Sequence, residues 1–106
     1  MAHDWAADVK KYVADANDAE IKGIIKHCGI ALHNKDSSYV ACGDKAERDR
    51  VRDGFLKKKL ALTVGDAELD KAIVEVCGTM KGDRDKSRVA FYYLLASKFG
   101  KLSLFG

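Results

Sequence analysis

Three cysteines and three histidines are the side chains of this chain best suited to nucleophilic or metal chemistry. They are Cys28, Cys42, Cys77, His3, His27 and His33. A cysteine nucleophile needs a lowered thiol pKa and a base oriented beside it. Cys42 meets the first condition best, because Gly43 and Asp44 follow it at a predicted helix start, and a helix N-terminus favours the thiolate. No spacing places a base beside it, so an enzyme with a reactive cysteine is the least favoured function.

Metal ligands would have to be assembled in space, because the chain has neither an H-E-x-x-H motif nor a C-x-x-C pair. The nearest set is His27, Cys28 and His33. Neighbouring residues point about 100° apart on a helix, which makes shared ligation by His27 and Cys28 awkward. A glycine-rich phosphate loop is also absent. We therefore expect no metal, no cofactor and no catalytic residue.

The number and spacing of the cysteines argue against a disulfide framework, since they are odd in number and not closely paired. We predict three reduced thiols. Cys28 and Cys77 fall within apolar helical patterns, where a free cysteine behaves as a small hydrophobic side chain. The sequence leaves open whether Cys28, Cys42 or Cys77 has a redox role.

Basic side chains concentrate in the segment after Asp44 and are the main candidates for binding phosphates. If that segment is one α-helix, several of its cations share a sector of roughly 60°. The candidate phosphate-binding residues are Arg48, Arg52, Lys57, Lys58 and Lys59. Acidic residues interleave with them, and the net charge of +3 is low for a dedicated nucleic-acid binder. A solvated charged face is therefore favoured over nucleic-acid binding.

The elements that must position these residues are helices. Apolar residues recur at helical spacing, no proline interrupts them, and no stretch alternates as a strand would. The 106 residues suffice for one core, so we predict an all-α fold in a single domain, residues 1–106, with about five helices around an apolar C-terminal helix. The helices are predicted at 4–13, 17–33, 44–59, from Thr63 or Asp66 to 81, and at 86–99.

Several residues mark the ends of these helices or their close contacts. Asn17, with Glu20 three residues later, resembles a capping box, and Gly100 is placed to end the last helix. On the helix at 17–33, Ile30 lies opposite the main apolar face, beside Gly23. This side is predicted to be a second buried side or a partner-facing patch. Close backbone packing at Gly23 would offset the cost of a helical glycine, roughly 1 kcal/mol.

The C-terminal helix contains eight successive residues, Val89 to Ala96, without a charge. They point in every direction around a helix, so this helix needs neighbours on all sides. Its aromatic residues sit among leucine and valine, which favours a core over a surface for stacking bases. Apolar residues that the domain leaves uncovered would form a dimer or partner interface. The candidate partner-binding residues are Ile30, Tyr92, Tyr93, Leu104 and Phe105. The tail after Gly100 is expected either to fold back over the domain or to reach a partner.

Uncharged runs are far shorter than the ~18 residues of a membrane helix. Asp4 and Asp8 stand where a signal peptide would carry positive charge. We expect a cytoplasmic protein without a membrane segment.

Several stretches together resemble a family of small bacterial all-helical proteins known only as a domain of unknown function. They are DWAADVKKYV, HCGIAL, VACGD, VRDGFLKKKL, AELDKAIVEVC and KSRVAFYYLLASKFGKL. The resemblance spans nearly the whole chain and implies an all-α fold. It implies no activity, cofactor or catalytic residue.

The leading hypothesis is a non-catalytic interaction module that self-associates or docks a protein partner through exposed apolar residues. The alternative is a nucleic-acid-associated accessory protein that uses the basic helix face, with affinity that falls steeply with salt. No convergent set of acid, base and nucleophile supports an enzyme.

Overall fold

Helices make up most of the computed structural model, which describes residues 5–29, 32, 38–82 and 86–105. In chain order they are α1 (Trp5–Lys10), α2 (Asp18–Cys28), α3 (Lys45–Arg50), the π-helix η2 (Val51–Lys59), α4 (Asp66–Thr79), α5 (Arg88–Lys98) and the 3₁₀ turn η3 (Leu102–Leu104). Across these ranges there is no strand, only an isolated antiparallel bridge between Tyr39 and Ser87. None of the helices in the described ranges is long and apolar enough to cross a bilayer. The predicted all-α class is confirmed.

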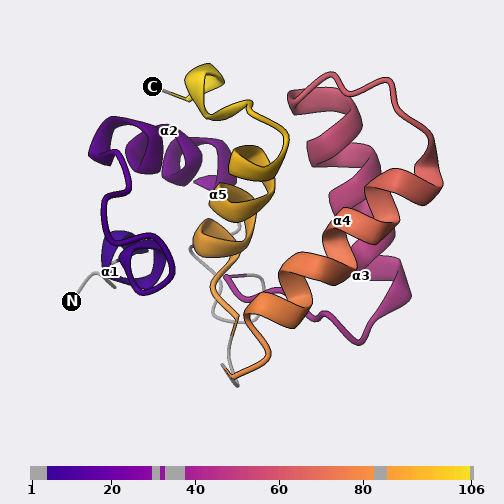
Figure 1. Cartoon of the computed structure of the whole chain (residues 1–106), viewed down its shortest axis with the longest axis horizontal. Helices are drawn as coiled ribbons and strands as arrows, with labels where there is room; N and C mark the ends of the chain where they lie inside the picture. Colours follow the sequence, from indigo (N-terminus) through magenta and orange to yellow (C-terminus); the bar gives the residue numbers. More distant parts are fainter. Residues whose placement is uncertain (1–4, 30–31, 33–37, 83–85, 106) are drawn as a thin grey trace.

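The apolar helix α5 lies at the centre of the fold. Figure 1 shows α1 and α2 on one side of it and α3 and α4 on the other. Val89, Phe91 and Leu95 are fully shielded from solvent, as a helix with apolar residues all round requires. Tyr93 and Ala96 are buried as well. The predicted packing of the other helices around the C-terminal helix is confirmed.

Asn17 caps α2 as predicted, but the bond that would complete a capping box is replaced by another. Its side-chain oxygen accepts hydrogen bonds from the backbone N–H groups of Ala19, at 2.8 Å, and Glu20, at 3.2 Å. In a capping box the Glu20 side chain would accept from the Asn17 N–H. Here the Asn17 N–H donates to the Tyr93 hydroxyl at 3.3 Å. The start of α2 is therefore tied directly to α5.

Gly100 ends α5 with the left-handed φ of +67°. The Gly100 N–H donates to the Ser97 carbonyl at 3.1 Å, and the Lys101 N–H donates to the Ala96 carbonyl at 2.8 Å. These are the two hydrogen bonds of a Schellman motif, so the predicted role of Gly100 is confirmed. The chain turns back after it, and the Phe105 side chain is buried. Of the two outcomes expected for the tail, it takes the first and folds over the domain.

The folded-back tail packs on α2 at Gly23. A Cβ atom built on Gly23 would lie 2.1 Å from the carbonyl oxygen of Phe105 and 2.7 Å from its Cβ. Only a residue without a side chain permits this approach. The predicted close backbone packing at Gly23 is therefore confirmed, and the element that packs there is the C-terminal turn.

The helix predicted at 44–59 is α-helical only as far as Arg50. It continues as η2, at whose end the Leu60 N–H donates to the carbonyl of Phe55, five residues earlier, at 2.9 Å. Val51, Phe55 and Leu56 are buried, and their separation by four and five residues suits the i to i+5 bonding of a π-helix. The prediction of one continuous α-helix is wrong here. The change of helix type also removes the basis for a shared sector of cations.

Other helix boundaries also differ from the predicted ones, and α1 ends at Lys10 instead of continuing to 13. Gly65 is the N-cap of α4, in place of Thr63 or Asp66. The α2 helix ends at Cys28 instead of continuing to 33, because Gly29 turns the chain with a φ of +45°. Gly29 supplies the positive φ that ends α2, whereas Gly65 begins α4 with an extended backbone that other residues also adopt.

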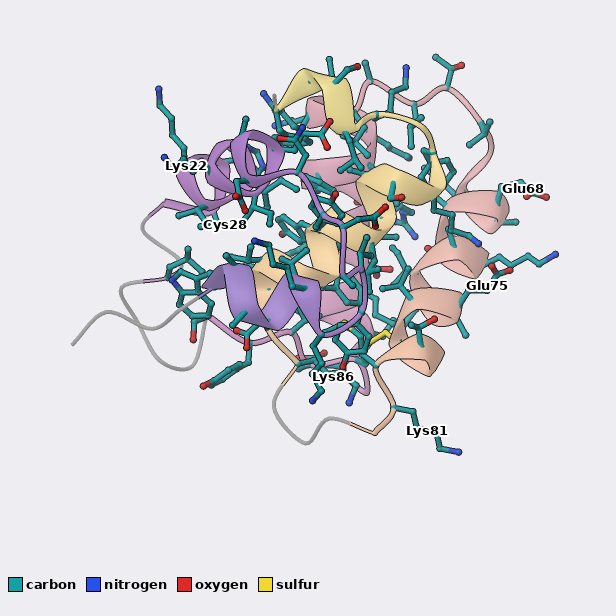
Figure 2. All side chains as sticks on the ribbon, turned by 60° about the vertical axis from the view of Figure 1, so that its left-hand side comes forward. Lys22, Cys28, Glu68, Glu75, Lys81 and Lys86 are labelled. Atoms are coloured by element: carbon teal, nitrogen blue, oxygen red, sulfur yellow. A yellow bond between two sulfur atoms is a disulfide. The ribbon has the colours of Figure 1, made fainter. Side chains whose placement is uncertain are left out.

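Cys42 and Cys77 form a disulfide, with their Cα atoms 6.0 Å apart. It joins the turn before α3 to the last turns of α4, and Figure 2 shows its sulfur atoms beside α4. The prediction of reduced thiols is wrong for these two residues, because an odd cysteine count cannot show which residues helix packing brings together. Cys28 is free and buried, as predicted. Cross-linking residues 35 positions apart stabilises a fold by about 4 kcal/mol in the chain-entropy description.

Replacing Gly23 with alanine should destabilise the protein through its contact with the tail. The added methyl group must push the Phe105 backbone away from α2, at a cost of about 1–3 kcal/mol in the free energy of unfolding. Gly78→Ala is the matched control, because a Cβ at helical Gly78 meets no atom within 4 Å and alanine favours a helix. Urea unfolding measures both variants. Equal stability of the two would contradict the close packing at Gly23.

Candidate functional site

An open pocket lies where the C-terminal turn packs on α2 and on the end of η2. Its volume is about 340 Å³. The lining residues are Gly23, Lys26, His27, Lys59, Leu104 and Phe105. Figure 1 shows the C-terminal turn beside α2, and the absence of a side chain at Gly23 allows this close arrangement. The pocket thus exists only because the tail folds back.

Aromatic rings form a layer beneath the pocket. The Phe55 and Tyr92 rings stack with centroids 4.1 Å apart, and the Phe105 ring lies 6.0 Å from Phe55. The His27 ring covers their edge, 5.4 Å from Phe55. Phe55 and Phe105 are buried, so these rings stack on one another and offer no open face to a nucleobase. The aromatic layer supports the cations above it.

The pocket carries positive charge from two separate elements. Lys26 and His27 belong to α2, and Lys59 is the last residue of η2. The Lys59 ammonium group lies 5.3 Å from the centroid of the Phe105 ring, a cation–π distance. Partial burial of the His27 ring, and then the charge of Lys59, lower the pKa of His27 below its ordinary value of 6.5. No side-chain carboxylate among the described residues lines this pocket.

Two other surface pockets of the described chain differ from the pocket at the C-terminal turn. In each of them, an ion pair already neutralises a lysine. In the pocket between α3 and α4, Lys45 pairs with Asp49 at 2.8 Å. In the pocket between α4 and α5, Lys98 pairs with Glu75. The pocket at the C-terminal turn is therefore the best candidate for attracting an anion from solution.

Most of the basic face predicted to bind phosphate is also neutralised within the fold. Arg52 contacts the carboxylates of Asp49, Asp53 and Asp70 at 2.9 to 3.2 Å. Lys57 lies 2.5 Å from Asp66 and 3.6 Å from Asp53, and the Arg48 guanidinium donates to the Cys42 carbonyl. Within the described chain Lys58 and Lys59 form no ion pair, and of the predicted group Lys59 alone lines the pocket. Phosphate binding by the five residues together stays a prediction.

The residues predicted to bind a partner are unequally accessible. Tyr93 and Phe105 are buried, Tyr92 is partly exposed, and Leu104 is half exposed at the rim of the pocket. Ile30 lies outside the described residues. A role for the group in partner binding stays a prediction, and Leu104 is the member best placed to meet a partner.

Lys26 is a pocket residue that the sequence did not single out, and His27 was considered there only as a metal ligand. The signal for them was their position beside Gly23, on the side of α2 predicted to face a partner or a second buried contact. Sequence spacing could not show that Lys59 would join them, because this contact depends on how the end of η2 packs against the tail.

A buried ion pair joins α3 to α5. The Arg88 guanidinium lies 2.7 Å from Glu47, and both side chains are about nine-tenths buried. Arg50 also contacts Glu47 at 2.7 Å, and Arg88 donates to the Tyr92 hydroxyl at 3.0 Å. This network of contacts holds Tyr92 under the pocket. The network leaves no room for a ligand among the contacts described. Its role is therefore to position other groups.

The cysteines and histidines do not assemble a reactive centre in the described part of the chain. Cys42 is held in the disulfide, so the hypothesis of a reactive free thiol there is wrong. Burial raises the pKa of Cys28 to about 12, which leaves it protonated and unreactive. The described residues contain no group of three potential metal ligands. His33, the third member of the set considered for a metal, lies outside those residues.

Replacing Arg88 with methionine should cost about 3 kcal/mol of stability at neutral pH, because Glu47 would remain buried without its partner on α5. Lys81→Met is the control, since Lys81 points into solvent (Figure 2) and should change stability by less than about 0.5 kcal/mol. Urea unfolding measures both.

The same variant should show a weaker dependence of stability on acid pH. Burial by itself raises the pKa of Glu47, but hydrogen bonds and charge from Arg50 and Arg88 outweigh it and lower that pKa below its ordinary 4.5. The unfolded chain then binds the proton more readily, so this stabilisation is present above pH 4.5 and lost as the pH falls below it. The difference in free energy of unfolding between wild type and Arg88→Met should therefore narrow below pH 4.5. A difference that stays constant with pH would contradict the role of Arg88 in lowering the pKa of Glu47.

Comparison with known proteins agrees with the resemblance noted in the sequence. No curated protein matches the chain significantly. The model of one protein family, described as "Protein of unknown function (DUF2853)", matches residues 4–103. That match covers nearly all of the 106 residues. The chain therefore belongs to the DUF2853 family.

Proposed function

We propose that this protein is a non-catalytic interaction module that docks an acidic segment of a partner protein in the pocket at the C-terminal turn. The observation that carries the proposal is the set of three basic side chains, Lys26, His27 and Lys59, gathered in a pocket that no side-chain carboxylate of the described residues lines. Unpaired cations at such a site attract acidic groups and speed their encounter.

The rim of the pocket adds an apolar contact to this charge. Leu104 is half exposed there, and its exposed surface could pack against an apolar side chain of a partner. A volume of about 340 Å³ is at the small end for a ligand site, so one or two side chains would fill it. An acidic residue next to an apolar one fits this combination best.

A protein partner fits these features better than a nucleic acid. An extended nucleic-acid surface would need a row of available cations and open aromatic faces. Arg52 and Lys57 are occupied by carboxylates, and Phe55 and Phe105 are buried. Within the described part of the predicted basic face, only Lys58 and Lys59 have neither an ion pair nor a side-chain hydrogen bond, and of these two only Lys59 lines the pocket.

The lining residues also favour binding over catalysis. His27 could act as a base, but no hydroxyl, thiol or carboxylate side chain among the described residues lines the pocket for it to activate. The site has the groups to hold an anion and lacks a nucleophile for His27 to serve.

A fluorescent peptide of alternating glutamate and leucine should bind the wild-type protein, with affinity measured by anisotropy. A matched peptide with glutamine for glutamate should bind much more weakly. The double variant Lys26→Gln/Lys59→Gln should lose about tenfold in affinity for the acidic peptide, as removal of two favourable charges predicts. Lys81→Gln, an exposed lysine outside the pocket, is the control and should bind as wild type does.

Three outcomes would reject the proposal. They are tighter binding of a single-stranded oligonucleotide than of the peptide, equal loss of affinity in the two lysine variants, and no binding of either probe. A second copy of the chain is a further alternative occupant of the pocket. Sedimentation of the free protein tests this alternative by showing whether the protein forms dimers.

Affinity for the acidic peptide should rise as the pH falls below 6.5. Partial burial and the charge of Lys59 lower the pKa of His27 from its ordinary value of 6.5, so His27 gains its positive charge only below that pH, while the peptide carboxylates stay ionised down to about pH 5. The charged or titratable groups facing His27 are Lys59 from η2 and Tyr92 from α5, and burial raises the pKa of Tyr92, which keeps it protonated there. His27→Gln should bind with affinity independent of pH. A variant with the wild-type pH profile would contradict the role of His27.

A further inference from the structure

We propose that the Cys42–Cys77 disulfide is a site of reversible thiol–disulfide exchange with a dithiol reductant, and that its reduction releases the turn before α3 without unfolding the core. The disulfide lies apart from the pocket, so the proposal is independent of peptide binding. The proposal rests on three observations. Cys42 and Cys77 are accessible, Cys28 is buried away from them, and their bond is the covalent link that holds the turn before α3.

The two cysteines are accessible to a reductant. Both are partly exposed, although they pack against the core. Each is followed by a glycine, Gly43 or Gly78, and a Cβ built on either one meets no atom within 4 Å. The chain beside each cysteine is therefore uncrowded, and the partial exposure of both residues gives the access that an attacking thiolate requires.

The third cysteine cannot take part in the exchange. Cys28 lies on α2, is buried, and has a pKa raised by that burial to about 12. At neutral pH it is therefore protonated and offers no thiolate to attack the bond. Cys42 and Cys77 therefore form an isolated pair that can open and close without forming wrong bonds.

The reaction balances as a two-electron exchange. A thiolate of the reductant attacks one sulfur of the Cys42–Cys77 bond, which forms a mixed disulfide and releases the other sulfur as a thiolate. The second thiol of the reductant then displaces the protein sulfur. The protein gains two electrons and two protons as two thiols, and the dithiol becomes a disulfide.

Few other contacts hold the turn between Val40 and α3. The Asp44 N–H donates to the Ala41 carbonyl, and the Asp44 carboxylate caps the Ala46 N–H, but both bonds are local. Arg48 donates to the Cys42 carbonyl from α3 itself. The disulfide is thus the covalent link from this turn to α4, and reduction should free the turn and the start of α3. Phe91, by contrast, is fully buried on α5, where α1, α2 and α4 pack around it without a covalent link.

Thiol labelling and hydrogen exchange on the native wild-type protein test the proposal together. In millimolar dithiothreitol, mass spectrometry after alkylation should show two labelled thiols, Cys42 and Cys77, with Cys28 unlabelled. The amides of Asp44 and Ala46 should exchange at least about tenfold faster than in the oxidised protein, and that of Phe91 less than about twofold faster. Removing the reductant and adding oxidised dithiothreitol should restore the original rates.

The double variant Cys42→Ser/Cys77→Ser should give the exchange pattern of the reduced protein, including protection at Phe91. The proposal is overturned by any of three results. They are a disulfide that resists reduction without denaturant, labelling of Cys28 in parallel with the other two thiols, and exchange at Phe91 that accelerates as much as exchange at Asp44.

Discussion

The uncharged block of α5 must be covered on every side, and this requirement organises the rest of the molecule. A helix with leucine, valine and aromatic side chains all round cannot face water without a large loss of hydrophobic stabilisation. The described structure meets the requirement with α1 and α2 on one side and α3, η2 and α4 on the other. Polar links then fix the neighbours in place, through Asn17 and Tyr93 at α2 and through Glu47 and Arg88 at α3.

The pocket follows from the same requirement. The tail turns back at Gly100 and places Phe105 against α2, where Gly23 leaves room for its backbone. This packing brings Lys59 close to Lys26 and His27 of α2, over a layer of stacked aromatic rings. On the basic face most of the described charges are neutralised, as at Arg52 with its three carboxylates. The pocket differs because its lining residues form no ion pairs with carboxylates of the described chain.

The sequence was informative where a local pattern determines the structure. Asn17, Asp44 and Gly100 take the capping positions expected from their residue types, and the apolar spacing identified the helices and the central position of α5. The sequence was uninformative where contacts between residues far apart in the chain determine the structure. The Cys42–Cys77 bond and the contact of Lys59 with the tail depend on how separate helices pack. The sequence did not predict the π-helix, because the spacing of Val51, Phe55 and Leu56 also fits an α-helix.

The central claim is that the pocket at the C-terminal turn receives an acidic segment. The most direct test is an NMR titration of the isotope-labelled protein with the glutamate and leucine peptide, which reports binding residue by residue. We expect saturable shifts at Lys26, His27, Lys59 and Leu104, with little change along α3. Shifts centred on Arg48 and Arg52 of the basic face, or no shifts at any peptide concentration, would contradict the claim.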